Sequence, residues 1–247
     1  MMKNKGLNGL KINASLFVVL SVFIGFNYIF SSCASSEIAD SGDVNQDAIY
    51  HYYAVTYDAN SSKSYDVEAQ FRFGGNKGTT LRLTDPSKVY VNGNEMKEES
   101  NVLRGCFYTL SLDDGNEFEF KFVDTEEKEY INKCKIYSAE LKNVDDIIAD
   151  LDYEVKWIGL PLAANESMVC TIEDNEGNIA TGGSDIVGSQ SVNIDKDDME
   201  TLMAGNAEIY LTRTSFVDAD EVADEGGKIY TEYKSEKKSV KIKRLKD

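Results

Sequence analysis

The sequence predicts an all-β protein: two tandem immunoglobulin-like β-sandwiches that follow an N-terminal export segment and contain at most one or two short helices. The composition favours strands, with 14 Tyr and 11 Phe among 247 residues. Several segments alternate between apolar and polar residues, most clearly Ser64–Phe73, "SYDVEAQFRF". This alternation indicates a strand with one buried face, and many short strands separated by turn residues are typical of a sandwich.

The first 32 residues have the composition of an export signal. Lys3, Lys5 and Lys11 come first, without any acidic residue, and the apolar run Ala14–Phe30 follows. A positive start followed by an apolar middle is typical of a secretory signal. The run has 17 residues and is interrupted by Asn27. A membrane-spanning helix needs about 20 mainly apolar residues, so the segment favours a removable signal over a permanent anchor.

Ser31, Ser32 and Cys33 directly follow the apolar run. This junction resembles the lipobox of bacterial lipoproteins, although Phe30 stands where that family usually has leucine. The resemblance implies that residues 1–32 are removed, that the Cys33 thiol is diacylated, and that lipid attaches the chain to a membrane. Two acyl chains, at about 0.8 kcal/mol per buried CH2, anchor a protein stably, whereas one does so only marginally.

The position after Cys33 bears on location. Lipoproteins kept at an inner membrane often carry aspartate there, and this chain has Ala34. The resemblance therefore implies a cell-envelope protein at an outer membrane. Two alternatives stay open: a conventional signal with an unmodified Cys33, or an uncleaved anchor with its lysines inside. All three place the remainder outside the cytoplasm.

Residues 33–47, rich in Ser, Asp and Asn, are expected to form a flexible tether, and residues 48–137 the first sandwich. Turns are predicted at Gly74–Gly78, Asn92–Gly93 and Asp113–Asn116, because Gly, Asn and Asp favour tight reversals. The seven expected strands are Tyr50–Asp58, Ser64–Phe73, Thr79–Thr84, Lys88–Val91, Cys106–Leu112, Glu117–Val123 and Glu129–Tyr137.

Residues 138–247 are expected to form the second sandwich. Helical periodicity appears briefly over Ser138–Leu151. A short helix is also predicted over Asp195–Gly205, where Asp195 can cap the start and Gly205 can end it. The six expected strands are Tyr153–Gly159, Ser167–Asp174, Ser189–Ile194, Ala207–Phe216, Gly227–Ser235 and Lys238–Lys243.

The charge of the chain excludes some partners. The whole sequence has a net charge of −17; without the three N-terminal lysines, 23 basic and 43 acidic residues remain, which gives −20. Such a surface repels phosphate, so we expect neither nucleic-acid binding nor adsorption to an anionic membrane face.

No residue pattern points to catalysis or to a zinc site. His51 is the single histidine, and no nucleophile motif accompanies it, so we expect it to be a strand residue. The cysteines show no C-x-x-C spacing. Cys106 and Cys134 lie in the same predicted sandwich, so both a disulfide and free thiols are compatible with the sequence, and Cys170 is expected in a core.

Carboxylates are abundant but fall mostly in predicted turns. The densest acidic segment is Asp218–Gly227, where Asp218, Asp220 and Asp224 offer oxygens that calcium could use. The spacing does not match the helical calcium loop, so a mobile acidic hairpin tip is the preferred interpretation. Accordingly, we expect no metal and no cofactor.

Aromatic residues are the best candidates for ligand contacts. Tyrosines on both faces of one strand cannot all enter one core, so some are expected at the surface or at the domain junction. The candidates are Tyr50, Tyr52, Tyr53, Tyr57, Tyr65 and Trp157. The sequence therefore predicts a non-catalytic envelope module that is anchored through Cys33 and binds a glycan or an envelope protein. The alternatives are a glycan-acting hydrolase with paired carboxylates and an assembly or surface-fibre accessory subunit.

Overall fold

The computed structural model describes residues 37–61 and 63–245. The predicted signal at 1–32, the predicted lipid attachment residue Cys33 and the start of the predicted tether lie outside the described residues. Within the described ranges, no helix is both long enough and apolar enough to cross a membrane.

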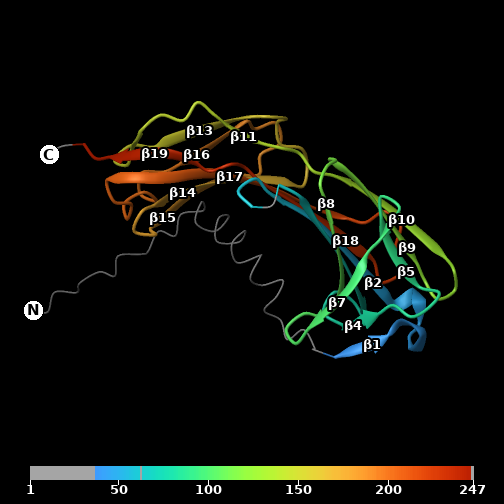
Figure 1. The fold of residues 1–247 in the computed structure, drawn as a ribbon. Coiled ribbons are helices and arrows are strands. Elements are labelled where there is room, and N and C mark those ends of the chain that lie inside the picture. Colours follow the sequence, from blue (N-terminus) through green and yellow to red (C-terminus); the bar gives the residue numbers. More distant parts are fainter. Residues whose placement is uncertain (1–36, 62, 246–247) are drawn as a thin grey trace, which may run out of the picture.

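The predicted all-β class with two β-sandwiches is confirmed (Figure 1). The strands of the first layer of the first sandwich are β1 (Ile38–Asp40), β4 (Thr79–Arg82), β3 (Tyr65–Phe73), β2 (Ile49–Asp58), β18 (Gly227–Lys234), β7 (Lys97–Asn101) and β8 (Gly105–Leu112). Its second layer is formed by β10 (Glu129–Lys135), β9 (Glu117–Val123), β5 (Lys88–Val91) and β6 (Asn94–Glu95).

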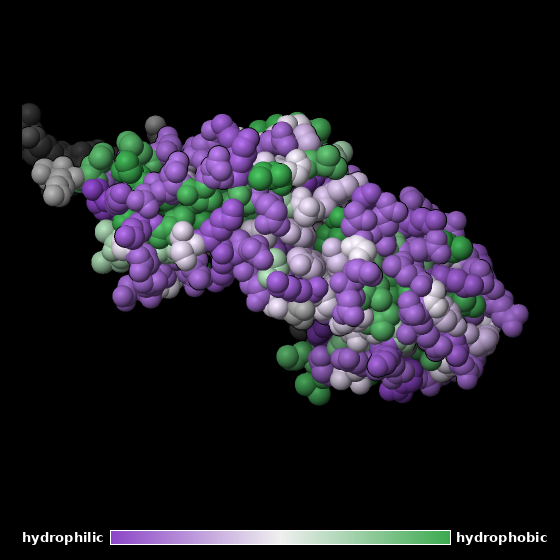
Figure 2. All heavy atoms as spheres, turned by 45° about the horizontal axis from the view of Figure 1, so that its top comes forward, coloured by the Kyte–Doolittle hydropathy of each residue, from purple (hydrophilic) through white to green (hydrophobic). Residues whose placement is uncertain are grey.

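The second sandwich has two layers of its own. One contains β15 (Ile179–Ser184), β14 (Glu166–Asp174), β17 (Gly205–Asp218), β19 (Lys238–Lys243) and β12 (Ile147–Ile148). The other contains β11 (Glu140–Lys142), β13 (Tyr153–Ile158) and β16 (Ser191–Ile194). The exposed side chains on the face drawn in Figure 2 are mainly hydrophilic, as the acidic composition suggests.

One continuous sheet joins the sandwiches. Strand β17 pairs with β14 and β19 in the second sandwich, and its last residues pair with β18. Strand β18 then pairs in parallel with β2, with Gly227 opposite His51 and Lys234 opposite Asp58. Backbone hydrogen bonds therefore run without interruption from one sandwich into the other.

Each sandwich has its own hydrophobic core. Tyr53, Phe71 and Phe120 belong to the first, and Trp157, Met168 and Ile209 belong to the second. The chain passes from one core to the other between Ile136 and Ala139. Residues 217–233 return to the first core, so β18 completes the first sandwich although it lies late in the sequence.

The segment expected to be a tether is partly folded. Strand β1 pairs in parallel with β4, and two 3-10 helices follow, η1 (Ser41–Asp43) and η2 (Gln46–Ala48). The Gln46 side chain is buried and donates to the backbone oxygens of Ser41 and Val44. Local polarity suggested a flexible chain, but these polar groups find partners inside the fold. The expectation of flexibility was wrong from residue 38 onward.

Both helical expectations were wrong. Residues 138–151 form β11 and β12, because pairing with β13 and β19 satisfies their backbone groups. Residues 196–201 form successive turns. A helix would direct the Met203 amide to the Met199 oxygen, but that amide donates to Asp174 Oδ2 at 2.8 Å, and Arg244 Nη2 donates to the Met199 oxygen at 3.2 Å.

Candidate ligand pocket at the junction of the sandwiches

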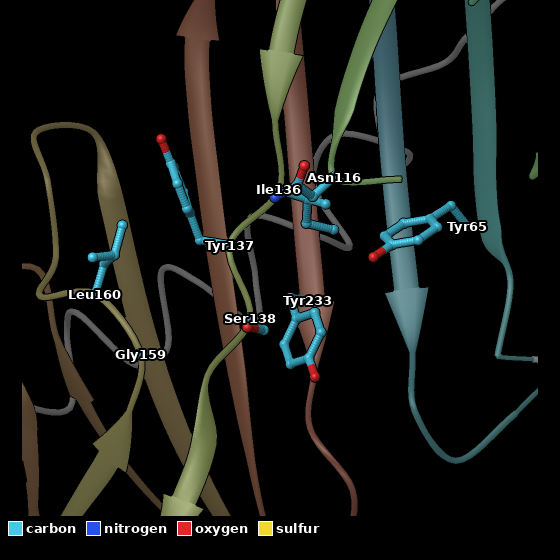
Figure 3. Close-up of a pocket in the computed structure, with 8 residues that line it drawn as sticks. All are labelled: Tyr65, Asn116, Ile136, Tyr137, Ser138, Gly159, Leu160 and Tyr233. Atoms are coloured by element: carbon cyan, nitrogen blue, oxygen red, sulfur yellow. The ribbon is translucent and has the colours of Figure 1, made fainter. Parts of the chain in front are cut away.

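A pocket of about 270 Å3 lies where the two sandwiches meet (Figure 3). Figure 3 shows Tyr65 and Tyr233 on one side of it and Tyr137 and Leu160 on the other. Its lining comes from β3, from β18, from the turn before β9, from the segment after β10 and from the loop after β13. The lining residues are Tyr65, Asn116, Ile136, Tyr137, Ser138, Gly159, Leu160 and Tyr233.

Two tyrosines that line the pocket, Tyr65 on β3 and Tyr233 on β18, flank Tyr57 on the strand between them, and we call these three rings the aromatic wall. Tyr57 on β2 stands directly opposite Tyr65 on β3 and opposite Tyr233 on β18. The Tyr57 ring centroid is 4.8 Å from that of Tyr65 and 5.2 Å from that of Tyr233, with which it is stacked. Cross-strand aromatic pairs stabilise a sheet and fix ring orientation, so Tyr65 and Tyr233 are held in place at the pocket.

The Tyr65 and Tyr233 hydroxyl groups stay protonated at neutral pH, because the pKa of each is raised. Burial raises the pKa of Tyr233, and its hydrogen bond to Glu140 raises the pKa further. Burial also raises the pKa of Tyr65, and the neighbouring Tyr57 adds to this effect. The wall therefore offers neutral aromatic faces and hydroxyl groups to a ligand.

A buried ion pair supports the opposite wall. Arg213 Nη2 lies 2.5 Å from Glu166 Oε2, and the two side chains are 3% and 6% exposed. Arg213 Nη1 also donates to the Leu160 oxygen at 2.9 Å, and its guanidinium lies over the Tyr137 ring at 5.3 Å. Trp157 Nε1 donates to the same Leu160 oxygen at 3.1 Å. Arg213 thus fixes both Leu160 and Tyr137.

The structure separates the aromatic residues that the sequence suggested. Tyr57 and Tyr65 come together, whereas Tyr53 and Trp157 are buried in the first and second cores. Tyr50 and Tyr52 are half-buried on the opposite face of β2. Sequence reasoning missed Tyr137 and Tyr233. The alternation of "KIYTEYK" gives the buried face of β18, but no local pattern gives its neighbour β2.

His51 cannot serve as a base in the pocket. Its side chain is fully buried, and neither ring nitrogen has a hydrogen-bond partner among the described residues. Its ring centroid lies 4.9 Å from Phe122, 5.0 Å from Tyr130 and 5.5 Å from Phe71. Burial, with a smaller contribution from Lys128, lowers the His51 pKa to about 3, so the imidazole is neutral.

The described cysteines form no disulfide, and the described residues contain no metal-binding cluster. Cys106, Cys134 and Cys170 are free thiols, so the structure contains no Cys106–Cys134 disulfide. Burial raises the pKa of all three thiols. Across residues 37–61 and 63–245, no three His, Cys, Asp or Glu side chains cluster closely enough to hold a metal ion.

The segment that contains Asp218, Asp220 and Asp224 is packed against the first sandwich. Asp218 ends β17, and the other two lie in the loop before β18. Asp218 pairs with Lys228 Nζ at 2.6 Å. The loop buries Ala219 and Ala223, and Glu221 Oε2 accepts from the Ile131 amide at 2.8 Å. The interpretation of this segment as a mobile tip was wrong, because its small apolar residues and its contacts with β10 fix it to the core.

The chain is distantly similar to two solved structures of adhesion proteins. No protein-family model matches the chain, and no curated protein matches it. It is similar to a crystal structure of a tetra-tandem repeat in the extending region of a large adhesion protein, with 14% identity and a TM-score of 0.25. That match covers 78% of this chain and 49% of the other.

A second solved structure concerns host cell surface retention of a 1.5-MDa bacterial ice-binding adhesin. Identity is 13%, the TM-score is 0.23, and the match covers 80% of this chain and 66% of the adhesin chain. The chain thus spans about half of the first adhesion protein and about two thirds of the second. At these TM-scores we transfer no function from either protein.

Proposed function

We propose that this protein is a non-catalytic module of the cell envelope that is anchored by lipid on Cys33 and binds a glycan in the junction pocket. The observation that carries the proposal is the row of Tyr65, Tyr57 and Tyr233, which places aromatic rings beside an open pocket. Tyr233 is a buried residue of the first core, whereas Tyr57 and Tyr65 pack against that core and stay partly exposed. Exposed aromatic surface of this kind often marks a binding site.

The chemistry of the pocket favours an uncharged ring with hydroxyl groups. Tyr65 and Tyr233 supply flat apolar faces, and the exposed Asn116 and Ser138 supply an amide and a hydroxyl for hydrogen bonds. Ligand pockets combine apolar walls with a few polar groups, and those for drug-sized molecules have volumes of about 300–1,000 Å3. The volume of this pocket, about 270 Å3, lies just below that range and favours a ligand as small as a sugar.

Two observations support binding without turnover. None of the eight lining residues is acidic or a histidine, whereas glycoside hydrolysis generally uses two carboxylates that flank the bond. The nearby Glu140 accepts a hydrogen bond from Tyr233. The single histidine, His51, is buried in the first core.

Binding to a glycan panel tests this function. We expect saturable binding by the wild type without release of product. Tyr65→Ala should weaken it by about tenfold, because one stacking ring is lost. Ser138→Trp should abolish binding, because the indole would occupy the pocket while the aromatic wall remains intact. The measurement is isothermal titration calorimetry on the best glycan of the panel.

Tyr90→Ala is the matched control, because Tyr90 is a partly exposed tyrosine of β5 that does not line the pocket. The affinity of the Tyr90→Ala variant for the glycan should equal that of the wild type. Equal losses for Tyr65→Ala and Tyr90→Ala would contradict the pocket assignment, and product release that stops after one carboxylate substitution would show a hydrolase instead.

A further inference from the structure

The turn between β7 and β8 carries two adjacent apolar side chains that are almost fully exposed. Val102 is 83% exposed and Leu103 is 82% exposed, the highest values among the large hydrophobic residues of the described chain. Asn101 Oδ1 accepts from the backbone amides of Leu103 at 3.0 Å and Arg104 at 2.8 Å. The turn therefore presents apolar side chains while Asn101 satisfies two of its amides, and we call Val102 and Leu103 the apolar tip.

The apolar tip lies at the end of the sandwich where the described chain begins. Strands β4 and β8 are both antiparallel to β3, and β1 is parallel to β4. All three strands therefore start at the same end of the sheet. Thr80 Oγ1 joins them: it donates to the Glu37 oxygen at 3.2 Å and accepts from the Cys106 amide at 3.0 Å. Figure 1 shows β1, β4 and β7 together, far from the second sandwich.

The sequence limits the distance between this end and a lipid on Cys33. Cys33 precedes Glu37 by four residues. Even a fully extended chain spans at most about 3.6 Å per residue, or about 14 Å here. Because β1 begins at Ile38, a long tether cannot separate the sandwich from the membrane.

We propose that Val102 and Leu103 insert into the surface of the bilayer that holds Cys33, so that the first sandwich stands on its β1–β4–β7 end. This inference rests on the proposed anchoring at Cys33. One attachment point leaves a domain free to tilt, and a second apolar contact beside it fixes the orientation. The second sandwich and the junction pocket then point away from the membrane.

The charges at this end favour an uncharged bilayer surface. Arg82 pairs with Glu98 at 3.1 Å and lies 3.8 Å from Asp40, and Arg104 pairs with Glu68. Asp220 and Asp224 lie in the loop before β18, which starts at the same end as β2. Those acids repel anionic headgroups, so the tip fits a zwitterionic surface.

Tryptophan fluorescence in vesicles tests the inference. The lipidated full chain with Leu103→Trp would be reconstituted into phosphatidylcholine vesicles, with and without lipids brominated near the headgroup. We expect a blue-shifted emission and loss of that emission in brominated vesicles. The native Trp157 is buried in the second core and gives a constant background.

Ile158→Trp is the matched control, because Ile158 is an exposed apolar residue of the second sandwich, 61% accessible. Its emission should not respond to the brominated lipid. If the Leu103→Trp protein floats with the vesicles but is not quenched, the tip inference is overturned and the anchor stands. If the wild-type protein itself does not float, both the anchor and the tip inference fail.

Discussion

Replacement of Glu166 by Ala is expected to lower the free energy of unfolding by about 3–5 kcal/mol, because Arg213 would keep its charge in a buried site without a counter-ion. The two side chains are 3% and 6% exposed in the native protein. Glu166 Oε2 also accepts from the Ala163 amide at 2.7 Å, and this amide would lose its partner as well.

The position of Arg213 on β17 explains why a buried ion pair with Glu166 is needed. Ala207, Ile209 and Leu211 point into the second core, and Arg213 follows them on the same face of β17. Further along the strand, Val217 packs against the first core. The inward face of β17 therefore passes from one core to the other through a charged residue. Its hydrogen bonds to the Leu160 and Pro161 oxygens fix the loop beside the pocket.

Urea denaturation followed by the fluorescence of Trp157 measures this effect, because Trp157 bonds the same Leu160 oxygen. The matched control is the double variant Glu166→Leu/Arg213→Met, which removes both charges and keeps apolar volume. It should recover most of the lost stability. If Glu166→Ala and the double variant are equally destabilised, the loss comes from the hydrogen bond of the Ala163 amide, which both variants lack, and not from an unpaired charge.

Acid is expected to destabilise the protein through His51. The pKa of His51 falls from an ordinary 6.5 to about 3 on folding. Below pH 6.5 the unfolded chain therefore binds a proton that the folded chain excludes, and stability falls as the pH drops toward 3. At about 1.4 kcal/mol per pKa unit, the loss is on the order of 3–5 kcal/mol. Above pH 6.5 this contribution is constant.

The His51→Phe variant isolates that contribution. The introduced phenyl ring would be apolar among Phe71, Phe122 and Tyr130, and it cannot titrate. We expect the unfolding free energy of the variant to depend less on pH between 6.5 and 3 than that of the wild type. The two proteins are compared by the slope of unfolding free energy against pH. A change in packing that does not depend on pH leaves this slope unchanged. Identical slopes would show that His51 is not the source of acid sensitivity.

Local patterns predicted the strands well because side-chain alternation and turn chemistry act over a few residues. Asn92 and Gly93 form the expected hairpin turn between β5 and β6, both with positive φ, 47° and 76°, which suits Asn and especially Gly. The same local reasoning failed at Asp195–Gly205. The Asp174 and Arg244 side chains that bond this segment lie far away in the sequence.

The candidate site could be predicted only in part, because it depends on which strands become neighbours. The sequence named Tyr57 and Tyr65 as candidate contact residues, but Tyr233 joins them only because β18 pairs with β2 across more than 170 residues of sequence. A period-two pattern determines the face of a strand and not its partner. Likewise, Val102 and Leu103 become informative only when β1 places Glu37 at the same end of the sandwich.

The proposed lipid attachment at Cys33 would determine which end of the molecule meets a membrane. The most direct test compares the wild type with Cys33→Ser by detergent phase partition of the expressed full-length chain, together with the intact mass of the mature protein. We expect the wild type in the detergent phase, with a mass that starts at Cys33 and includes acyl chains. Cys33→Ser should move to the aqueous phase or remain unprocessed. A wild-type mass without acyl chains, or unchanged partition of the variant, would contradict lipid attachment at Cys33.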